Sequence, residues 1–578
     1  MHAHAILRLS TKIKVVVAER SHVTHRRKKV LVKMKYMKLG TKPDTFYTEE
    51  TTRTVLSDVQ TDIVIQIKNT KYALHKFPLL LKCGLLQRLC SYADSSTSNM
   101  SSTSSRPIIL NNFPADEDAF ELCAKFCYNI SITLSAQNFP SVFSAANFLQ
   151  MTDSVSRPNL LPKLHTFFLS FILPNWKDSV AALASIEYSS DSDQNINILI
   201  RQLIDSVVSK ILTHPSQVTW SFTYSRHPGR SVPKDWWTED IADLHIAHFR
   251  SIIFAIRSAS KSLPPALVGE ALHVYTVKNL PDPEENRVSS SSTLRKDRRV
   301  LEAIVSMIPA ETGAVSCGFL MRLLKIAMAI EASASVKAEL VRRAGRQLDE
   351  VSSPRDLVFF RCGETEGRRI YEVGFVEAMV ESFLESGRRN MIGRVAKVFD
   401  EYLGLIARRD KELKLEKLVH LVKLMPEFAR QDHNGLYRAI DTFLQEHPDL
   451  SKPERKQLCQ LINCHKLSPE VRAHAIANDQ LPLRTLVQLL FIEQAKASGN
   501  AGGCGAGIPP NKPSTGVSSV LETNNQARVP IERSGEKQQH HQRRESRDQE
   551  RVRLSSNYIR RETTTSSEHA GKQVKKSS

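Results

Sequence analysis

The strongest hydrophobic pattern in the chain lies in residues 434–494. Leu436, Ile440, Phe443 and Leu444 follow one another at spacings of four, three and one residues. Because an α-helix completes a turn about every 3.6 residues, these positions share one helical face. The spacing therefore predicts an amphipathic helix that packs its apolar side against other helices.

Three further helix starts follow in the same stretch. Ser451 and Glu454 have the spacing of a capping box, in which the two side chains satisfy free backbone amides. Ser468 precedes a proline, and Pro482 precedes another apolar run; proline fits the first helical position because no N–H is needed there. The last of these helices is expected to bury Leu483, Leu486, Val487, Leu490 and Phe491.

A different pattern occupies residues 55–165. Ile63, Ile65 and Ile67 alternate with less apolar residues, which predicts a half-buried strand, and residues 72–74 read as its return strand. A leucine-rich helical region at 75–90, a short strand at 108–110 and helices at 116–129 and 136–151 follow. The segment is therefore expected to form a small α+β domain.

The rest of the chain is predicted to be helical or disordered. Residues 166–234 are expected to form a helical connector, and residues 235–494 a large all-α domain without a regular repeat. Residues 1–36 form a basic N-terminal extension, interpreted either as a disordered tail or as a gene-model artefact, with Met34 or Met37 as alternative starts. The Gly-rich and then polar composition of residues 495–578 predicts a disordered basic tail.

The net charge of +19 comes mostly from the two ends of the chain. Residues 1–38 carry 11 basic and 1 acidic side chains, and residues 495–578 carry 15 and 8. The middle of the chain holds the remaining 54 basic and 52 acidic residues and is nearly neutral. A basic folded face for nucleic acid is therefore not expected, and no nucleic-acid partner is predicted.

Candidate chemistry is sparse. The nine cysteines contain no CxxC pair, and their odd number without a secretory signal favours a reducing compartment. We find no phosphate-binding loop, dinucleotide turn or hydrolase motif; Ser316 and Cys317 come nearest to a nucleophile, but fit the start of a helix better. No catalytic residue, metal site or cofactor is predicted, and the chain is not expected to be an enzyme.

The α+β segment resembles the BTB/POZ domain. The resemblance rests on DIVIQIKNTKYALHKFPLLL, a short strand and then AFELCAKFCYN. It places Asp62 before the first strand and His75 and Lys76 after the second, positions that lie at or near the dimer interface in this family. The three residues are dimer-interface candidates with a structural role, the buried acid being expected to pair with a basic partner.

The helical segment is similar to the plant non-phototropic hypocotyl 3 / root phototropism 2-like family. The matching blocks are DWWTEDIADL, GEALHVY, FLMRLLKIAM, GLYRAIDTFLQEHPDLSKPERKQLCQLINCHKLS and LPLRTLVQLLFIEQ. Residues 34–50 also resemble the usual beginning of family members, which favours the artefact interpretation of residues 1–33.

Four residues are phosphorylation candidates. Tyr437 matches a tyrosine that the family resemblance marks as a target, although its place beside an apolar face favours packing. Ser546 and Ser555 lie in basophilic kinase patterns, and Ser577 follows two lysines near the last residue. A phosphoserine in this tail could dock a 14-3-3 protein, whereas the unmodified basic tail could attract an anionic membrane surface.

The resemblance implies a non-enzymatic adaptor. The BTB domain is expected to form homo- or heterodimers and to bind cullin-3 of a RING E3 ubiquitin ligase, while the helical domain presents an unknown protein substrate in light- or auxin-type signalling. The alternative is a ligase-independent dimeric scaffold for a membrane-associated, phototropin-like kinase. The expected location is cytoplasmic, with peripheral attachment at the plasma membrane as a second setting.

Overall fold

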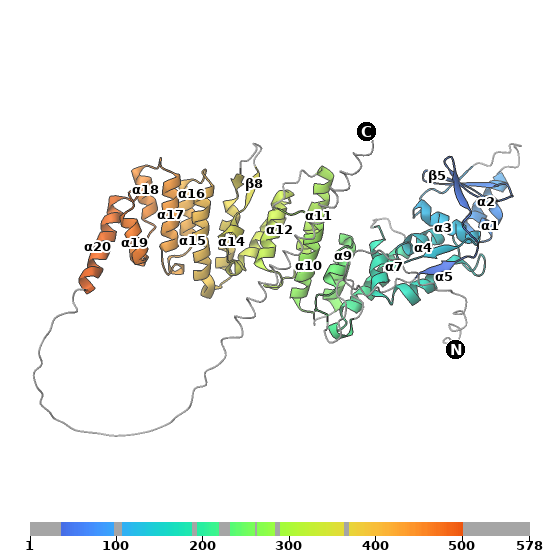
Figure 1. Ribbon diagram of the computed structural model, residues 1–578, viewed down its shortest axis with the longest axis horizontal. Coiled ribbons are helices and arrows are strands. Elements are labelled where there is room, and N and C mark those ends of the chain that lie inside the picture. Colours follow the sequence, from blue (N-terminus) through green and yellow to red (C-terminus); the bar gives the residue numbers. More distant parts are fainter. Residues whose placement is uncertain are drawn as a thin grey trace, which may run out of the picture. The chain divides into compact units, whose positions relative to one another are not determined.

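The computed structural model describes residues 36–96, 107–187, 194–218, 232–259, 263–283, 290–362 and 369–500. Figure 1 shows strands and helices mixed in the N-terminal part and helices dominating thereafter. The predicted fold class, an α+β BTB-type domain followed by a large helical region, is confirmed. The tail serines Ser546, Ser555 and Ser577 lie outside the described residues.

The N-terminal part is built on a five-stranded sheet with the order β2-β3-β5-β4-β6. Its strands are β2 (Phe46–Glu49), β3 (Thr52–Val55), β4 (Ile63–Ile67), β5 (Thr70–Leu74) and β6 (Ile108–Ile109). The β3/β5 and β4/β6 pairs are parallel, and the other pairs are antiparallel. Two further strands, β1 (Met37–Leu39) and β7 (Ile132–Leu134), pair with each other.

Local sequence explains why these elements form. Ile63, Ile65 and Ile67 are all buried, so the alternating pattern marks the inner face of β4 as predicted. The neighbouring helices are α1 (Lys76–Leu80), α2 (Gly84–Ser96), α3 (Glu117–Cys127) and α4 (Phe139–Phe148). Asp116 caps α3 by accepting a hydrogen bond of 2.8 Å from the backbone N–H of Ala119.

The helical part continues the chain from residue 160. Its helices are α5 (Leu160–Phe167), α6 (Trp176–Ala184), α7 (Gln194–Ile211), α8 (Thr238–Ile241), α9 (Ile246–Ala259), α10 (Pro265–Asn279), α11 (Ser291–Met307), α12 (Cys317–Ala329), α13 (Ala334–Gly345), α14 (Val373–Glu385), α15 (Ile392–Arg409), α16 (Leu415–Leu424), α17 (Asn434–Glu446), α18 (Lys452–Cys459), α19 (Pro469–Ile476) and α20 (Leu483–Asn500). A short hairpin of β8 (Phe360–Cys362) and β9 (Arg369–Tyr371) interrupts them, which the apolar pattern does not predict. Most helices pack against a near neighbour in the sequence.

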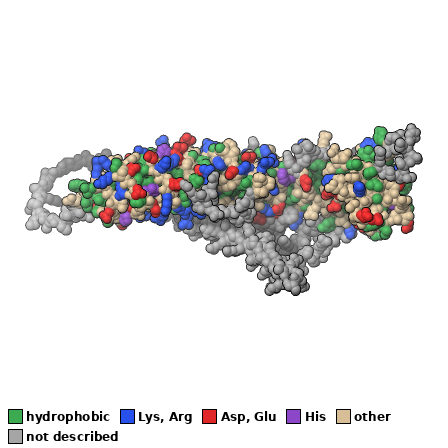
Figure 2. Space-filling view, turned by 90° about the horizontal axis from the view of Figure 1, so that it is seen from above, with side chains coloured by type: hydrophobic (Ala, Val, Ile, Leu, Met, Phe, Trp, Pro, Cys, Tyr) green, Lys and Arg blue, Asp and Glu red, His purple; other side chains and the backbone are tan. Residues whose placement is uncertain are grey.

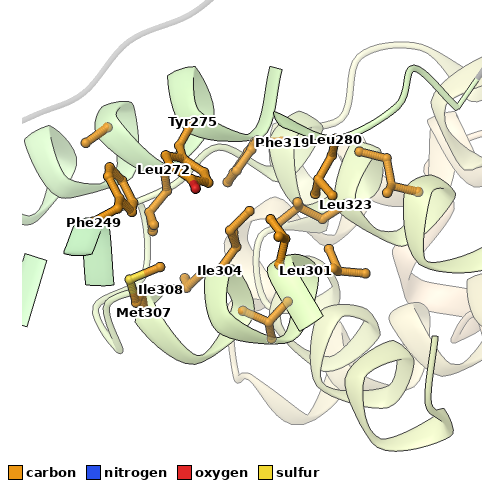
Figure 3. Close-up of a cluster of buried hydrophobic side chains, with 14 of the residues drawn as sticks. Phe249, Leu272, Tyr275, Leu280, Leu301, Ile304, Met307, Ile308, Phe319 and Leu323 are labelled. Atoms are coloured by element: carbon orange, nitrogen blue, oxygen red, sulfur yellow. The ribbon is translucent and has the colours of Figure 1, made fainter. Parts of the chain in front are cut away.

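Apolar packing between helices forms the core of this part. Figure 3 shows one such cluster, in which side chains from α9, α10, α11 and α12 meet. The rings of Phe249 and Tyr275 stack at 4.1 Å, and the Tyr275 hydroxyl donates a hydrogen bond of 3.0 Å to the Leu244 carbonyl. The polar tip of a buried tyrosine is thus satisfied inside an otherwise apolar layer.

The expected connector is packed against the helices that follow it. Trp176, in α6, is buried and lies 4.8 Å from the ring of Trp236. Its indole N–H donates a hydrogen bond of 2.8 Å to Asp240, one of the acidic residues in the first turn of α8. A buried N–H and a buried carboxylate satisfy each other, which ties residues 166–187 to the helical region.

The helix starts predicted near the end of the chain are present. Ser451 and Glu454 form the capping box of α18, and the Ser468 hydroxyl accepts a hydrogen bond of 3.4 Å from the Val471 N–H at the start of α19. The predicted buried face of α20 is wrong. Leu483, Val487, Leu490 and Phe491 are exposed, whereas Leu489 and Thr485 are buried. The helix packs on α19 and the 464–466 turn through a different side from the one that the apolar spacing indicates.

Charges are mixed over the helical surface. On the face drawn in Figure 2, Lys and Arg side chains lie among Asp and Glu side chains along the helices. Among the described residues, no helix combines the length and the apolar character that crossing a bilayer requires.

A substitution at Gly269 tests the close packing of α10. A Cβ atom at this position would lie 1.9 Å from the carbonyl oxygen of Ala314, so a substitution must displace backbone. We expect Gly269→Ala to lower the free energy of unfolding by about 1–3 kcal/mol, measured by urea denaturation. The control is Gly318→Ala in α12, where no other atom lies within 4 Å of the new Cβ; it should raise stability by about 0.5–1 kcal/mol. Equal effects of the two substitutions would contradict the close contact.

Candidate functional site

Asp62 and Lys76 meet where β5 leads into α1. The Asp62 carboxylate accepts a hydrogen bond of 2.6 Å from the backbone N–H of Lys76, the first residue of α1. Asp62 is exposed, and among the described residues it forms no ion pair with a basic side chain. The expectation of a buried acid paired with a base is therefore wrong, because the partner of Asp62 is a free amide at a helix start.

His75 is held in place from three directions. Its ring is buried, with Nε2 at 2.9 Å from the Val59 carbonyl and Nδ1 at 3.0 Å from the Tyr128 hydroxyl. Its backbone N–H also donates to the Tyr128 hydroxyl at 2.7 Å. Burial raises the pKa of Tyr128. The cluster fixes the 56–59 segment, the end of β5 and the end of α3 together, which is a structural role.

Four apolar side chains at α1 and in the 56–59 segment are exposed. Phe77 is 74% exposed, and Leu81 lies one turn further on and is also exposed. Leu56 and Val59 are exposed in the segment that His75 holds. His75, which precedes α1, holds the 56–59 segment next to the start of that helix, and neighbouring exposed apolar residues are typical of a protein interface. We call these four residues the α1 patch; the apolar spacing of the sequence does not reveal them, since it cannot tell covered from uncovered faces.

A charged network fastens the sheet to α3. Arg53 donates to both carboxylate oxygens of Glu121, at 2.9 and 2.6 Å, and Lys125 contacts Glu121 at 2.9 Å and Asp44 at 2.5 Å. Burial raises the pKa of Glu121, but the hydrogen bonds from Arg53 and Lys125 outweigh it and leave that pKa lowered. The network joins β3, α3 and Asp44, two residues before β2.

Tyr437 is inside the helical region. It is only 2% exposed, and its hydroxyl lies 2.7 Å from His474 Nδ1 and accepts a hydrogen bond of 3.2 Å from Asn478. The same Asn478 amide donates to Asp441 at 2.6 Å, so the network joins α17 to α19 and the turn after it. These contacts favour the packing interpretation. Phosphorylation of Tyr437 stays a prediction and requires α17 to separate from α19.

His433 lies at the start of α17 and is 3% exposed. Its Nδ1 accepts a hydrogen bond of 3.1 Å from the Asn463 N–H, so the ring is held neutral with its proton on Nε2. Burial, with the nearby Lys466 and Arg430, lowers the pKa of His433 to about 4. A neutral histidine at this place was not predicted from the sequence.

The residues considered for chemistry have structural roles. The Ser316 hydroxyl accepts a hydrogen bond of 3.2 Å from the Phe319 N–H at the start of α12, as the sequence predicts. Cys317 is buried, which raises the pKa of its thiol, and it lies 3.5 Å from the Ala344 carbonyl. Within the described ranges, no three His, Cys, Asp or Glu side chains form a group that could hold a metal ion.

Comparison with known proteins gives the family. A model of the BTB/POZ domain matches residues 53–157, and a model of the NPH3 family matches residues 235–471. BTB/POZ domain-containing protein At5g47800 of Arabidopsis thaliana is 45% identical over 494 residues, which cover 81% of this chain and 86% of that protein. The chain belongs to the NPH3 family.

Another Arabidopsis thaliana relative of the NPH3-family protein is Phototropic-responsive NPH3 family protein NPY2. It is 34% identical over 515 residues, covering 82% of this chain and 79% of that protein. The pairing of a BTB/POZ domain with an NPH3 domain makes the chain a BTB adaptor-type signalling protein. The resemblance drawn from the sequence is thereby confirmed, and the BTB/POZ domain supports dimerisation and protein partners.

The Tyr437 network can be tested by removing one hydroxyl. Tyr437→Phe leaves the ring in place but deprives Asn478 and His474 of a partner, and we expect a loss of about 1–2 kcal/mol in the free energy of unfolding. Tyr371→Phe is the control, since the Tyr371 hydroxyl has no hydrogen-bond partner among the described residues. The network is not important for stability if both variants unfold at the same denaturant concentration as the wild type.

Because the pKa of His433 is lowered, we expect the stability of the protein to depend on pH. Its pKa is lower in the folded chain than the ordinary value of 6.5, so the folded state favours the neutral ring. The neutral His433 ring contributes fully to the free energy of unfolding above about pH 6.5. This contribution, about 2–3 kcal/mol at most, is lost as the pH falls toward 4. We expect His433→Asn, which does not titrate, to lose less stability than the wild type between pH 7 and pH 4.5 in urea denaturation. Parallel losses in the two proteins would assign the pH dependence to other groups.

Proposed function

We propose that this protein is a substrate adaptor of a cullin-3 RING E3 ubiquitin ligase. The observation that carries the proposal is the BTB/POZ domain, joined in one chain to a helical NPH3 domain. An adaptor needs no bond-making group, because it acts by holding a target lysine near a ubiquitin conjugate and so raises the effective concentration.

The α1 patch supports a dimer through the BTB domain. Its four apolar side chains are exposed in the single chain, and their burial against a second copy would remove them from water. Asp62, His75 and Lys76 fix the start of α1 and the segment that carries Leu56 and Val59. We propose that they support the dimer interface rather than form its contact surface.

The second candidate is a dimeric scaffold that does not use a ligase. It is favoured by the relative NPY2, which is named as a phototropic-responsive protein. In this alternative the dimer recruits a membrane-associated, phototropin-like kinase, and tail phosphorylation at Ser546, Ser555 or Ser577 would control binding to a 14-3-3 protein or to an anionic membrane. Retention of cullin-3 distinguishes the two functions.

The dimer is tested with two charges in the α1 patch. In Phe77→Asp/Leu81→Asp, dimerisation would bury two carboxylates without partners, so we expect the molar mass from light scattering to fall from dimer to monomer. The control, Ile198→Asp/Val277→Asp, places the same charges at exposed apolar positions of α7 and α10 and should leave the mass unchanged. A monomeric wild type, or a dimeric patch variant, would contradict the proposed interface.

The ligase role is tested by co-precipitation with purified cullin-3. We expect the full-length wild type to retain cullin-3 in proportion to its own amount. A dimeric protein that fails to retain cullin-3 would remove the ligase proposal and leave the scaffold.

A further inference from the structure

A groove runs along α15 and α17, far in the sequence from the BTB domain. Its hollow measures about 930 Å³ and is lined by both helices, by the segment before α17 and by residues of the turns at 354–355 and 389–390. This part of the structure has no role in the proposed function.

Small residues make the floor of the groove. Gly393, Ala396 and Gly404 of α15 line it together with Ala439 of α17. A Cβ atom at Gly404 would lie 3.6 Å from the Cα atom of Ala439, which shows how closely the two helices approach. Because the side chains of these four residues are small or absent, they leave the floor hollow between the two helices.

The two helices run in the same direction along the groove. Gly435 lies against Asp400, and Ala439, one turn later, lies against Gly404, one turn after Asp400. The N-terminal turn of α17 therefore lies beside the middle of α15, about two turns after α15 begins. The dipole of α17 presents partial positive charge at this point of the groove, which favours a negative ligand.

The charge on the floor is neutralised internally. Arg430 and Asp400 are both buried and form an ion pair of 2.9 Å, with further hydrogen bonds from Arg430 Nε to both carboxylate oxygens. Arg430 also donates to two backbone carbonyls. This pair has no charge left for a ligand.

The rim of the groove is different. It carries six exposed cations, which form no ion pair within the described residues. They are Arg355, Arg389, Arg394, Lys397, Arg408 and Arg438. The only other carboxylates in the lining are those of Glu401 and Asp432, and Asp432 already accepts a hydrogen bond of 3.0 Å from the Asn434 N–H. In a region of nearly balanced charge, this is a concentrated positive surface.

We propose that this groove binds an acidic peptide segment of a partner protein. The rim cations would pair with Asp, Glu or phosphorylated side chains, and the exposed ring of Phe428 at the groove offers contact for one apolar side chain of the same segment. The inference goes beyond the proposed function, since the groove and its charge do not depend on what the BTB domain binds.

Other occupants fit the groove less well. Phe428 is the only aromatic residue in its lining, whereas single-stranded nucleic acid is bound on successive aromatic platforms. A bilayer surface is flat and would contact the rim without filling the hollow floor. The protein's own residues 495–578 carry 15 basic and 8 acidic side chains, so their net charge has the wrong sign.

The test uses the full-length protein and a short fluorescein-labelled peptide rich in Asp and Glu with one leucine, followed by fluorescence anisotropy. We expect Arg394→Glu/Lys397→Glu/Arg438→Glu to weaken binding about tenfold or more, because three attractive rim charges become repulsive. Arg394→Lys/Arg438→Lys keeps the charges and should bind within about twofold of the wild type. Phe428→Ala should weaken binding of this peptide more than that of a matched peptide without the leucine.

The control variant is Arg295→Glu/Lys296→Glu/Arg299→Glu, which makes the same charge change at exposed positions of α11, outside the groove. It keeps both basic tails, as the groove variant does, and should bind the peptide like the wild type. Equal weakening by the two triple variants, or no binding to the wild type, would overturn the proposal. So would tighter, groove-dependent binding of oligo(dT) or of phosphatidylserine vesicles. Thermal unfolding of each variant confirms that it is folded.

Discussion

The buried guanidinium of Arg430 joins α15 to the end of α16. Arg430 is buried between α15 and the end of α16, where it donates to the Asp400 carboxylate and to the carbonyls of Val422 and Met425. The last carbonyls of a helix have no partner inside it, so Arg430 satisfies groups that burial would otherwise leave unpaired. Burial raises the pKa of Asp400, and Arg430 opposes this by stabilising the charged carboxylate. Removal of either member would leave the other charged and buried, which costs several kcal/mol in typical proteins, about 3–5.

This constraint determines how α17 is placed. Once Arg430 is fixed under α15, the chain has only the residues from 431 to 433 before α17 begins. Gly435 then passes so close to Asp400 that a Cβ atom would stand 3.1 Å from the Asp400 Cβ. One turn later Ala439 lies against Gly404, so α17 runs parallel to α15 with the hollow floor between them. His433 is held nearby with its ring neutral, because burial disfavours the charged ring and the positive charges of Lys466 and Arg430 disfavour it further.

Local patterns in the sequence predicted the elements but not their partners. The alternation of Ile63, Ile65 and Ile67 and the Ser451 capping box depend on neighbours within a few residues, so the sequence is sufficient for them. The apolar stripe of α20 was misread, because periodicity identifies an apolar face without saying whether another element covers it. Arg430 gave no signal, since its partner Asp400 is thirty residues earlier and an arginine before a polar turn looks like a surface residue. The middle of the chain has nearly equal numbers of basic and acidic residues, so its net charge did not reveal the cations at the rim of the groove.

We expect the groove and the BTB dimer to act together when a partner binds. A dimer through the α1 patch carries two grooves, so a partner with two acidic segments, or a partner that is itself dimeric, would bind twice to one particle. The second contact then occurs at the effective concentration set by the first, and two weak, salt-sensitive contacts become a stable one. Charged rim contacts form quickly and are released quickly, and they weaken as ionic strength rises. A single groove would therefore hold a partner only briefly. A dimer with two grooves would hold the partner for longer, as an adaptor or a scaffold requires.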